Sequence, residues 1–338
     1  MRAARYHDAH RPLELEDIER PTPGPGQVLV RVEAAGVCGT ELHFLEGLLT
    51  PAKSPIVLGH EVAGTVAETG DGVDGWSEGD RVAVHYFHPC RLCRPCRTGY
   101  EHLCDRPEGF LAFLTDGGFA EYVAVPHTAL VAVPEALSFD QAAPLCCGGA
   151  TALHALAVSG LRMDDTALVF GCGGVGLALV QVLRRAGIRV LATSRSEAKR
   201  TAAARAGAAA VIDASAEDVA GAARAATGGR GVDAVFETVG RTTTMRTSLA
   251  SLAKRGALVF VGYSFDPLEV GPLELVVPEL RILTAVGNTR AELVAALERA
   301  AAGELEIPVH EVAPLDEVNR VLDALAAGKV VGRAILRP

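Results

Sequence analysis

The sequence lacks both a long apolar segment and a basic region. None of its 338 residues belongs to an uninterrupted apolar run of about 18 residues, the length that a membrane-spanning helix requires. The first residues, Met1 to Tyr6, show no apolar run leading to a signal cleavage site. A net charge of -9 without runs of Lys and Arg argues against general nucleic-acid binding. We therefore expect a cytoplasmic protein that binds neither membranes nor nucleic acid.

Internal repeats and low-complexity tracts are also absent, which excludes repeat architectures. At 338 residues the chain is too long for one core of typical size, so two domains are expected. A hydrophobic content of 49% and 36 glycines suggest an α/β protein with many tight turns. The eight cysteines of such an intracellular chain are expected to be metal ligands or buried thiols, because disulfides are rare in that compartment.

The pattern of the chain changes near residue 149. Before it, short apolar runs such as 28–32 and 82–84 alternate with Gly- and Pro-rich turns, which predicts a β-rich domain. After it, strands alternate with helical stretches, which predicts a parallel sheet covered by helices. The predicted strands are 167–170, 190–192, 210–212, 234–236 and 257–261, and the Ala-rich run 201–210 is interpreted as a helix.

The end of the chain departs from that alternation. After about residue 286 the sequence predicts two amphipathic helices and a last strand at 334–336. The second helix presents Val318, Val321, Leu322 and Leu325 on one face. These residues could return to the first domain, so we expect one domain from 1–148 and 287–338 and another from 149–286.

Four cysteines in one loop form the strongest local signal. They follow the pattern Cys-x2-Cys-x2-Cys-x7-Cys at Cys90, Cys93, Cys96 and Cys104. Four thiolates at that spacing can close a tetrahedron around zinc with no open position, which is typical of a structural site. His88 and His102 flank this loop and are interpreted as solvated histidines.

A second metal site is predicted at His60 and Glu61. The pair stands at the start of a short apolar run broken by glycine, and Cys38 and either Cys146 or Cys147 could add thiolates. A catalytic zinc has about three protein ligands and one open position. Taken alone, a His-Glu pair is more often a polar pair at a strand edge, so the prediction depends on the cysteines.

A dinucleotide site is predicted after the strand that ends at Phe170. Gly171, Gly173 and Gly176 form G-x-G-x-x-G with Gly174 and Val175 between them, and a helix follows. This arrangement brings the backbone close to a pyrophosphate at a helix N-terminus.

The end of the next strand predicts the cofactor. An NAD site would place an acid there for the ribose 2′-hydroxyl, but the chain has Ser194 and Arg195, with Lys199 and Arg200 further along. A hydroxyl and cations favour a 2′-phosphate, so NADP(H) is expected. In the alternative interpretation Glu197 takes the acidic role and Arg195 is only a charged residue at a helix start.

Thr40 and His43 are candidates for proton transfer. They lie three residues apart and share one face if the segment after Cys38 is helical. A hydroxyl and an imidazole so placed could pass a proton from a reacting oxygen to water. By itself, His43 would more often be a surface histidine.

These motifs together resemble the zinc-dependent medium-chain alcohol dehydrogenases over essentially the whole chain. Residues 59–66, continuing through Gly70 and Val73 to 79–82, are similar to that family's zinc signature. The resemblance implies a GroES-like β-rich catalytic domain and a doubly wound Rossmann domain, usually in dimers or tetramers. It also implies two zinc ions per subunit. The implied catalytic-zinc ligands are Cys38, His60 and Cys147, with Glu61 close enough to exchange with a water or substrate.

The same resemblance assigns the remaining residues. The four-cysteine loop matches the structural-zinc lobe, Thr40 and His43 match the proton relay, and Tyr86 falls where the family often has a substrate-pocket side chain. Gly39 departs from the pattern because many members have a basic residue there that contacts the cofactor phosphate. Cys147 is favoured over Cys146 as the ligand because residues 144–151 then align with the family's pattern without a gap.

The function predicted is hydride transfer between NADP(H) and an alcohol, aldehyde or ketone. Three alternatives remain at this point. The chain could prefer NAD(H), could reduce activated alkenes or quinones as zinc-free relatives do, or could be a catalytically silent nucleotide-binding protein. The full ligand set argues against the second alternative, and the intact Thr40 and His43 argue against the third.

Overall fold

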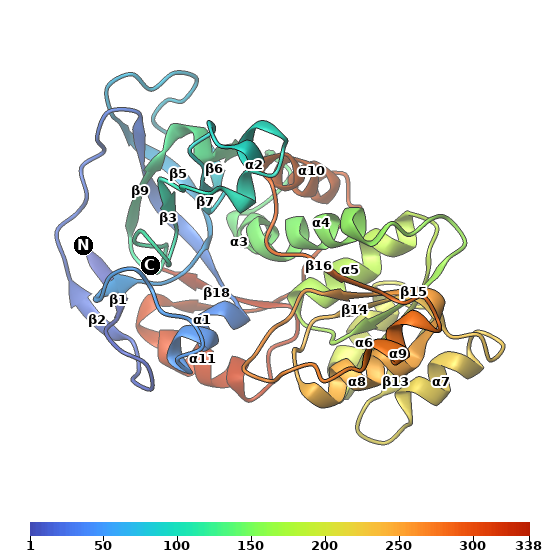
Figure 1. Ribbon diagram of the computed structural model, residues 1–338. Helices are drawn as coiled ribbons and strands as arrows, with labels where there is room; N and C mark the ends of the chain where they lie inside the picture. Colours follow the sequence, from blue (N-terminus) through green and yellow to red (C-terminus); the bar gives the residue numbers. More distant parts are fainter. The chain divides into compact units, whose positions relative to one another are not determined.

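The computed structural model describes residues 1–338, and the chain divides into two compact units (Figure 1). Unit 1 contains Met1–Ala150 and Asn288–Pro338, and unit 2 contains Thr151–Gly287. Both ends of the chain therefore contribute to unit 1.

Unit 1 is built mainly from antiparallel strands. Its largest sheet has the order β10-β6-β5-β3-β18-β17, with β9 also paired to β3. A three-stranded sheet has the order β2-β1-β4, and β7 pairs with β8. The strands are β1 (Arg2–Tyr6), β2 (Glu14–Asp17), β3 (Gln27–Val37), β4 (Ile56–Val57), β5 (Glu61–Thr69), β6 (Arg81–Val84), β7 (Phe87–His88), β8 (Gly109–Phe110), β9 (Tyr122–Pro126), β10 (Leu130–Ala132), β17 (Val309–Pro314) and β18 (Arg333–Arg337).

Short helices connect these strands. They are α1 (Gly39–Leu45), α2 (Arg94–Arg97), η1 (Glu101–Leu103), η2 (His127–Ala129), α3 (Phe139–Pro144), η3 (Leu145–Gly149), α10 (Arg290–Ala301), η4 (Leu315–Glu317) and α11 (Val318–Ala326). The last strand, β18, pairs antiparallel with β3, with Ile335 opposite Gly36. The end of the chain is thus held beside the strand that leads into α1.

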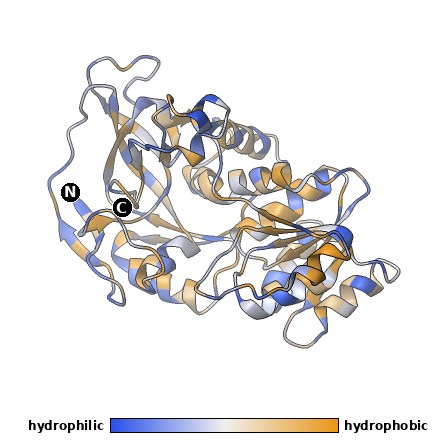
Figure 2. Ribbon diagram, in the orientation of Figure 1, coloured by the Kyte–Doolittle hydropathy of each residue, from blue (hydrophilic) through white to orange (hydrophobic).

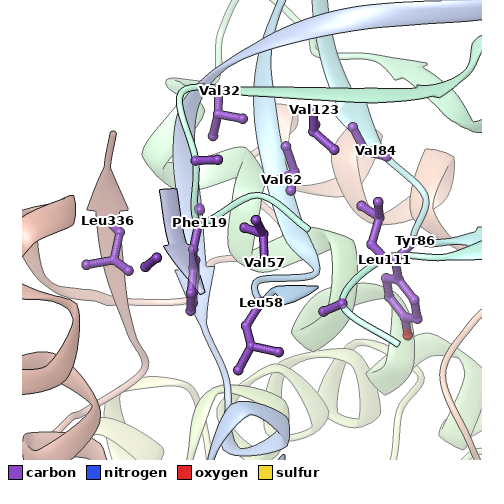
Figure 3. Close-up of a cluster of buried hydrophobic side chains, with 14 of the residues drawn as sticks. Val32, Val57, Leu58, Val62, Val84, Tyr86, Leu111, Phe119, Val123 and Leu336 are labelled. Carbon is purple, nitrogen blue, oxygen red and sulfur yellow. The ribbon is translucent and has the colours of Figure 1, made fainter. Parts of the chain in front are cut away.

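The core of unit 1 lies on the β3, β5 and β6 sheet. Val32, Val62 and Val84 are almost completely buried there, together with Phe119 from a loop and Leu336 from β18 (Figure 3). Consecutive residues are buried along much of β3, β5 and β6, so these central strands are covered on both faces. This packing fixes the ends of β3 and β5, where the candidate site begins.

Unit 2 contains a six-stranded sheet in the order β13-β12-β11-β14-β15-β16, and every pairing in it is parallel. This is the order of a doubly wound nucleotide-binding sheet, so the predicted fold class is confirmed. In Figure 2 apolar residues are frequent along these strands. The elements are β11 (Thr166–Phe170), α5 (Gly174–Arg185), β12 (Arg189–Ser194), α6 (Glu197–Arg205), β13 (Ala210–Asp213), α7 (Val219–Ala225), β14 (Val232–Glu237), α8 (Thr242–Ser251), β15 (Leu252–Phe260), α9 (Pro272–Val276) and β16 (Arg281–Thr284).

The Ala-rich run 201–210 is only partly helical, contrary to the prediction from sequence. Helix α6 ends at Arg205, and β13 begins at Ala210. Gly207 has a φ of 102°, a left-handed conformation that commonly follows the last turn of a helix. The glycine therefore stops the helix although the alanines around it favour one.

One helical stretch, Phe139–Ser159, is long and apolar enough to cross a membrane by composition. It runs through α3, η3 and α4 (Ala150–Ser159). However, 78% of its most apolar window is buried, which is typical of a core helix in a globular protein.

Candidate functional site

Four potential metal ligands come together in unit 1. One donor atom each from Cys38, His60, Glu61 and Cys147 lies within 4.8 Å of every other. Cys38 follows β3, and His60 directly precedes Glu61, the first residue of β5. Cys147 lies in η3, a π-helical turn between α3 and α4. Insertions of this kind in a helix often occur at functional sites.

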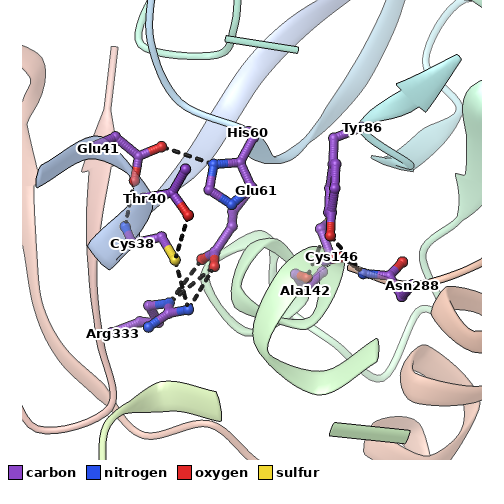
Figure 4. A network of polar contacts seen from close by, with 10 residues as sticks. All are labelled: Cys38, Thr40, Glu41, His60, Glu61, Tyr86, Ala142, Cys146, Asn288 and Arg333. Atoms are coloured by element: carbon purple, nitrogen blue, oxygen red, sulfur yellow. Dashed lines mark hydrogen bonds and ion pairs between the residues drawn. The ribbon is translucent and has the colours of Figure 1, made fainter. Parts of the chain in front are cut away.

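Glu41 orients two of these ligands. Its carboxylate lies 2.8 Å from His60 Nδ1 and accepts a hydrogen bond of 2.8 Å from the Cys38 backbone N–H (Figure 4). Binding of Nδ1 leaves Nε2 as the ring nitrogen for a metal, and carboxylate support of this kind is common behind zinc-binding histidines. Burial by itself would lower the pKa of His60, but Glu41 and Cys38 raise it well above the usual value.

This donor set fits zinc. Two sulfurs and one imidazole are ligands that zinc accepts in catalytic sites, with a further position for a water or a substrate. The pKa of Cys38 lies well below its usual value because of a hydrogen bond from Cys147, with help from Arg333 and His60. The site therefore already favours one thiolate.

Arg333 pairs with Glu61 inside the site. Arg333 Nε lies 3.0 Å from Glu61 Oε1, and Arg333 Nη2 lies 3.2 Å from Cys38 Sγ (Figure 4). Both residues of the ion pair are buried. Burial raises the pKa of Glu61 to about 7, although Arg333 opposes that shift. The predicted exchange of Glu61 with a water or substrate at the metal would have to compete with this ion pair.

The structure distinguishes between the adjacent Cys146 and Cys147. Cys147 belongs to the four-residue cluster, whereas Cys146 Sγ donates to the backbone oxygens of Val62 (3.4 Å) and Ala142 (3.8 Å). The geometry therefore favours Cys147 as the ligand.

Thr40 and His43 both lie on α1, three residues apart. Thr40 Oγ1 is 3.7 Å from Cys38 Sγ, so the hydroxyl lies beside the cluster. Both residues are half-buried, and neither is a fully exposed surface residue. This placement agrees with a path for protons that starts at the cluster.

Tyr86 lies against the cluster from the side of β6. Its ring meets the His60 ring edge to face, with the centroids 5.2 Å apart and an interplanar angle of 82°. The side chain is only 3% exposed. Tyr86 therefore forms part of the wall around His60.

The four-cysteine loop folds into a second cluster. The donor atoms of Cys90, Cys93, Cys96 and Cys104 lie within 4.8 Å of one another, and all four cysteines are free. Cys93 Sγ is 3.3 Å from Cys96 Sγ and 3.8 Å from Cys104 Sγ. Zn–S bonds of about 2.3 Å in a tetrahedron place the sulfurs roughly 3.8 Å apart, so this loop fits a zinc ion.

The interpretation of His88 and His102 as solvated residues is wrong. Both are buried, with exposures of 4% and 6%. His88 belongs to β7 and His102 to η1, and the Phe87 ring packs near His102. Burial lowers the pKa of His88 to about 4. The Gly, Pro and Arg residues around these two histidines are typical of a loop and did not indicate that the histidines are buried.

The glycine motif lies between β11 and α5, as the spacing predicts. Gly171 to Gly173 form the turn, and Gly174, Val175 and Gly176 begin the helix. A Cβ at Gly176 would lie 1.9 Å from the Gly171 carbonyl oxygen, whereas one at Gly173 would meet nothing within 4 Å. The turn is therefore closed tightly on itself at Gly176 and open at Gly173, as a pyrophosphate site requires.

The loop after β14 supports this turn. Thr238 Oγ1 donates to the carbonyl oxygens of Phe170 (2.9 Å) and Gly171 (3.3 Å). The buried Glu237 carboxylate accepts from the backbone N–H of Gly240 at 2.7 Å. Glu237 and Thr238 were not identified from the sequence, although their position at the end of a predicted strand was a usable signal.

Ser194 ends β12, and Arg195 follows it with its side chain exposed. The Arg195 guanidinium forms no ion pair, whereas Arg200 pairs with Asp213 at 2.8 Å. The charge of Arg200 is thus compensated locally, contrary to the expectation that it adds to the potential at this site. Lys199 is half-buried, and burial lowers its pKa.

Glu41 and Arg333, which bond to ligands of the metal cluster, were not predicted from the sequence. Glu41 stands three residues after Cys38 at the start of a helix, a spacing that is typical of a capping residue and could have revealed it. Arg333 has no local signal, because it reaches the cluster from the last strand.

The chain is similar to known proteins over its whole length. Residues 24–135 match the family model described as the alcohol dehydrogenase GroES-like domain, and residues 174–302 match the model described as zinc-binding dehydrogenase. The chain is 36% identical over 348 residues to an NAD-dependent alcohol dehydrogenase of Sulfurisphaera tokodaii, with 100% of both chains covered.

Solved structures are similar over the same length. The alcohol dehydrogenase from Aeropyrum pernix is 33% identical with a TM-score of 0.94 and 100% of both chains covered. A zinc-binding dehydrogenase from Sinorhizobium meliloti bound to NADP is 32% identical with a TM-score of 0.91, covering 100% of this chain and 99% of that one.

Proposed function

The chain belongs to the zinc-dependent medium-chain dehydrogenase/reductase family and is an NAD(P)-dependent zinc alcohol dehydrogenase, and we propose that it transfers hydride between NADP(H) and an alcohol, aldehyde or ketone. The GroES-like fold expected for the β-rich unit is confirmed by the family model. The single observation that carries the proposal is the buried cluster of Cys38, His60, Glu61 and Cys147.

We assign this cluster to a catalytic zinc and the four-cysteine loop to a structural zinc, giving two ions per subunit. The catalytic ion would be held by Cys38, His60 and Cys147, and Glu61 would be able to exchange with a water or substrate. When bound, zinc supplies a Lewis acid that lowers the pKa of an alcohol, and the nicotinamide supplies the hydride acceptor. In this assignment residues 1–148 and 287–338 form the catalytic domain, and residues 149–286 bind the dinucleotide.

The residues of the chain then have distinct tasks. Glu41 holds the His60 ring, Arg333 compensates the buried negative charge, and Tyr86 bounds the substrate pocket. The hydroxyl of Thr40 accepts the proton released by an alcohol, and His43 passes it toward solvent. Gly171, Gly173, Gly174, Val175 and Gly176 bind the pyrophosphate through their backbone.

The proposed preference for NADP(H) depends on the end of β12. No acid stands there to repel a 2′-phosphate, Ser194 offers a hydroxyl, and Arg195 offers an unpaired planar guanidinium. Lys199 adds a positive charge a turn later. Among the relatives, the Sulfurisphaera tokodaii protein is named NAD-dependent, and the Sinorhizobium meliloti structure is bound to NADP.

The test of the proposed function is a panel of alcohols and carbonyl compounds assayed with both cofactors by nicotinamide absorbance. One charge-assisted phosphate contact is worth about 1.5–3 kcal/mol, so NADP(H) should be favoured on the order of ten- to a hundredfold in kcat/KM. Ser194→Asp combined with Arg195→Ala should reverse that preference. A clear preference of the unmodified enzyme for NAD(H) would mean that another acid, such as Glu197, contacts the ribose.

We also propose that the enzyme is cytoplasmic and forms a homodimer or homotetramer. Strand β16 is at the edge of the parallel sheet, and nearby α9 exposes apolar side chains. Leu273 is 75% exposed, and Val276 and Val277 are each 70% exposed. An open sheet edge beside exposed apolar residues favours pairing with a second copy. Sedimentation of the parent protein and of Val276→Glu tests this proposal. The parent should sediment as an oligomer and the variant should dissociate. A monomeric parent would contradict the proposal.

A further inference from the structure

Asn288 is completely buried and is the first residue of the segment that returns to unit 1. Its Nδ2 lies 3.0 Å from Tyr86 Oη and 3.0 Å from the carbonyl oxygen of Cys146 (Figure 4). Its own carbonyl oxygen lies 3.0 Å from His85 Nε2. One buried residue thus binds three points around the metal cluster.

Two of these points adjoin the proposed zinc ligands. Tyr86 packs its ring on the edge of the His60 ring, and Cys146 immediately precedes Cys147 in η3. Asn288 contacts neither ligand directly. It can therefore act on the site only through the residues beside them.

The carbonyl oxygen of Cys146 determines how the amide of Asn288 is oriented. A carbonyl oxygen only accepts, so the NH2 group of the amide must face it, and the same NH2 group then faces Tyr86 Oη. Tyr86 accepts in this contact, and its O–H proton must point away from Asn288. The contact thereby helps to hold the phenol oxygen in place and directs its O–H proton away from Asn288.

The oxygen of the Asn288 side-chain amide lies in a different environment from its NH2 group. Asn288 Oδ1 is buried and has no hydrogen-bond partner. A buried polar atom without a partner is unfavourable, and an apolar side chain of similar size would avoid it. The two bonds that the NH2 group donates, to Tyr86 Oη and to the Cys146 carbonyl oxygen, offset that cost and account for an asparagine here.

We propose that Asn288 is a positioning residue that determines substrate selectivity by fixing Tyr86 against His60. This inference rests on the proposed function, because it assumes that the wall formed by Tyr86 bounds the alcohol pocket. Without Asn288 the phenol can shift relative to His60. Discrimination between small and bulky alcohols should then change while the metal cluster stays intact.

The test is a double-mutant cycle with Asn288→Leu, Tyr86→Phe and the two combined. The readouts are kcat and KM for ethanol and for benzyl alcohol, zinc content, and thermal stability. We expect Asn288→Leu to change the ratio of the two kcat/KM values by roughly three- to tenfold, the size expected of one lost hydrogen bond, with both zinc ions retained. Tyr86→Phe should change the ratio in the same direction, and Asn288→Leu should add no further change in that background.

The chain offers a matched control in Asn319, its other asparagine. Asn319 bonds the backbone N–H and carbonyl of Leu13 at 2.9 Å each, in the same unit. Asn319→Leu should lower stability without changing the selectivity ratio. If Asn288→Leu does not fold, Asn288→Ser replaces it, because serine is too short to bond Tyr86.

Two results would overturn the proposal. One is an unchanged selectivity ratio in folded Asn288→Leu or Asn288→Ser. The other is a full additional effect of the Asn288 variant in the Tyr86→Phe background, since a role exercised only through Cys146 would persist there. Failure of the proposed function is distinguishable from both, because the unmodified enzyme would then oxidise neither alcohol with either cofactor.

Discussion

Arg333 Nη2 lies 2.9 Å from Glu61 Oε1, with both side chains buried and 272 residues apart in the sequence. The pair joins the last strand of the chain to the first residue of β5. It places one cation among two cysteines and a carboxylate, and so stabilises the negative charge that the metal cluster carries before a metal binds.

Replacing Arg333 with Met should therefore destabilise the protein strongly. Removing one partner of a buried ion pair leaves the other charge uncompensated and typically costs about 3–5 kcal/mol. Arg337 on the same strand is a matched control, because its ion pair with Asp140 is exposed and Arg337→Met should cost at most about 1 kcal/mol. Denaturant unfolding of both variants measures the difference, and equal losses would contradict the structural role of Arg333.

A different prediction concerns the four-cysteine loop. Cys93→Ser should lower thermal stability and release one zinc ion, because a structural site contributes binding energy directly to folding. Metal analysis and calorimetry provide the measurement, and Cys146→Ser serves as a control outside both clusters. A Cys93→Ser protein with full stability and unchanged zinc content would exclude a structural zinc from this loop.

His43→Gln should slow alcohol oxidation most at low pH, where external base is scarce. The loss should be roughly 10²-fold or less, because solvent can partly replace one acid-base group. Profiles of kcat against pH for this variant and for His310→Gln provide the comparison, since His310 is exposed on β17. If the two profiles coincide with that of the parent, His43 has no part in proton transfer.

Two glycines of the dinucleotide motif should behave differently. Gly176→Ala forces a Cβ against the Gly171 carbonyl oxygen, so it should destabilise the protein without dinucleotide by about 1–3 kcal/mol. Gly173→Ala has open space around its Cβ, so stability should hold while dinucleotide binding weakens. Thermal unfolding and titration with NADPH fluorescence separate the effects. Tight binding by Gly173→Ala would show that the pyrophosphate does not approach that glycine.

The residues that the sequence revealed are those that follow a local pattern. Spacing alone brought together the four cysteines of the lobe, and the strand-turn-helix context located Gly171 to Gly176. The parallel sheet was predictable because its strands are buried on both faces and read as short apolar runs between helices.

The residues that the sequence did not reveal act over long distances. Arg333 contacts the cluster, and Asn288 contacts Tyr86 beside it, both from the last part of the chain. Nothing around them in the sequence marks them as partners of Glu61 and Tyr86. His88 looked solvated because its neighbours are loop residues, whereas burial depends on how the loop folds. Tertiary contacts of this kind are not encoded in any local periodicity.

In the proposed site, Cys38, His60 and Cys147 hold the zinc at which the alcohol reacts. The most direct test measures zinc per chain, NADPH affinity and alcohol turnover in the parent enzyme and in His60→Gln. The parent should contain two zinc ions and turn over alcohol. The folded variant should contain one zinc ion, bind NADPH with unchanged affinity and show no turnover. Turnover by His60→Gln at the parent rate, or a fully active parent that contains a single zinc ion, would contradict the claim.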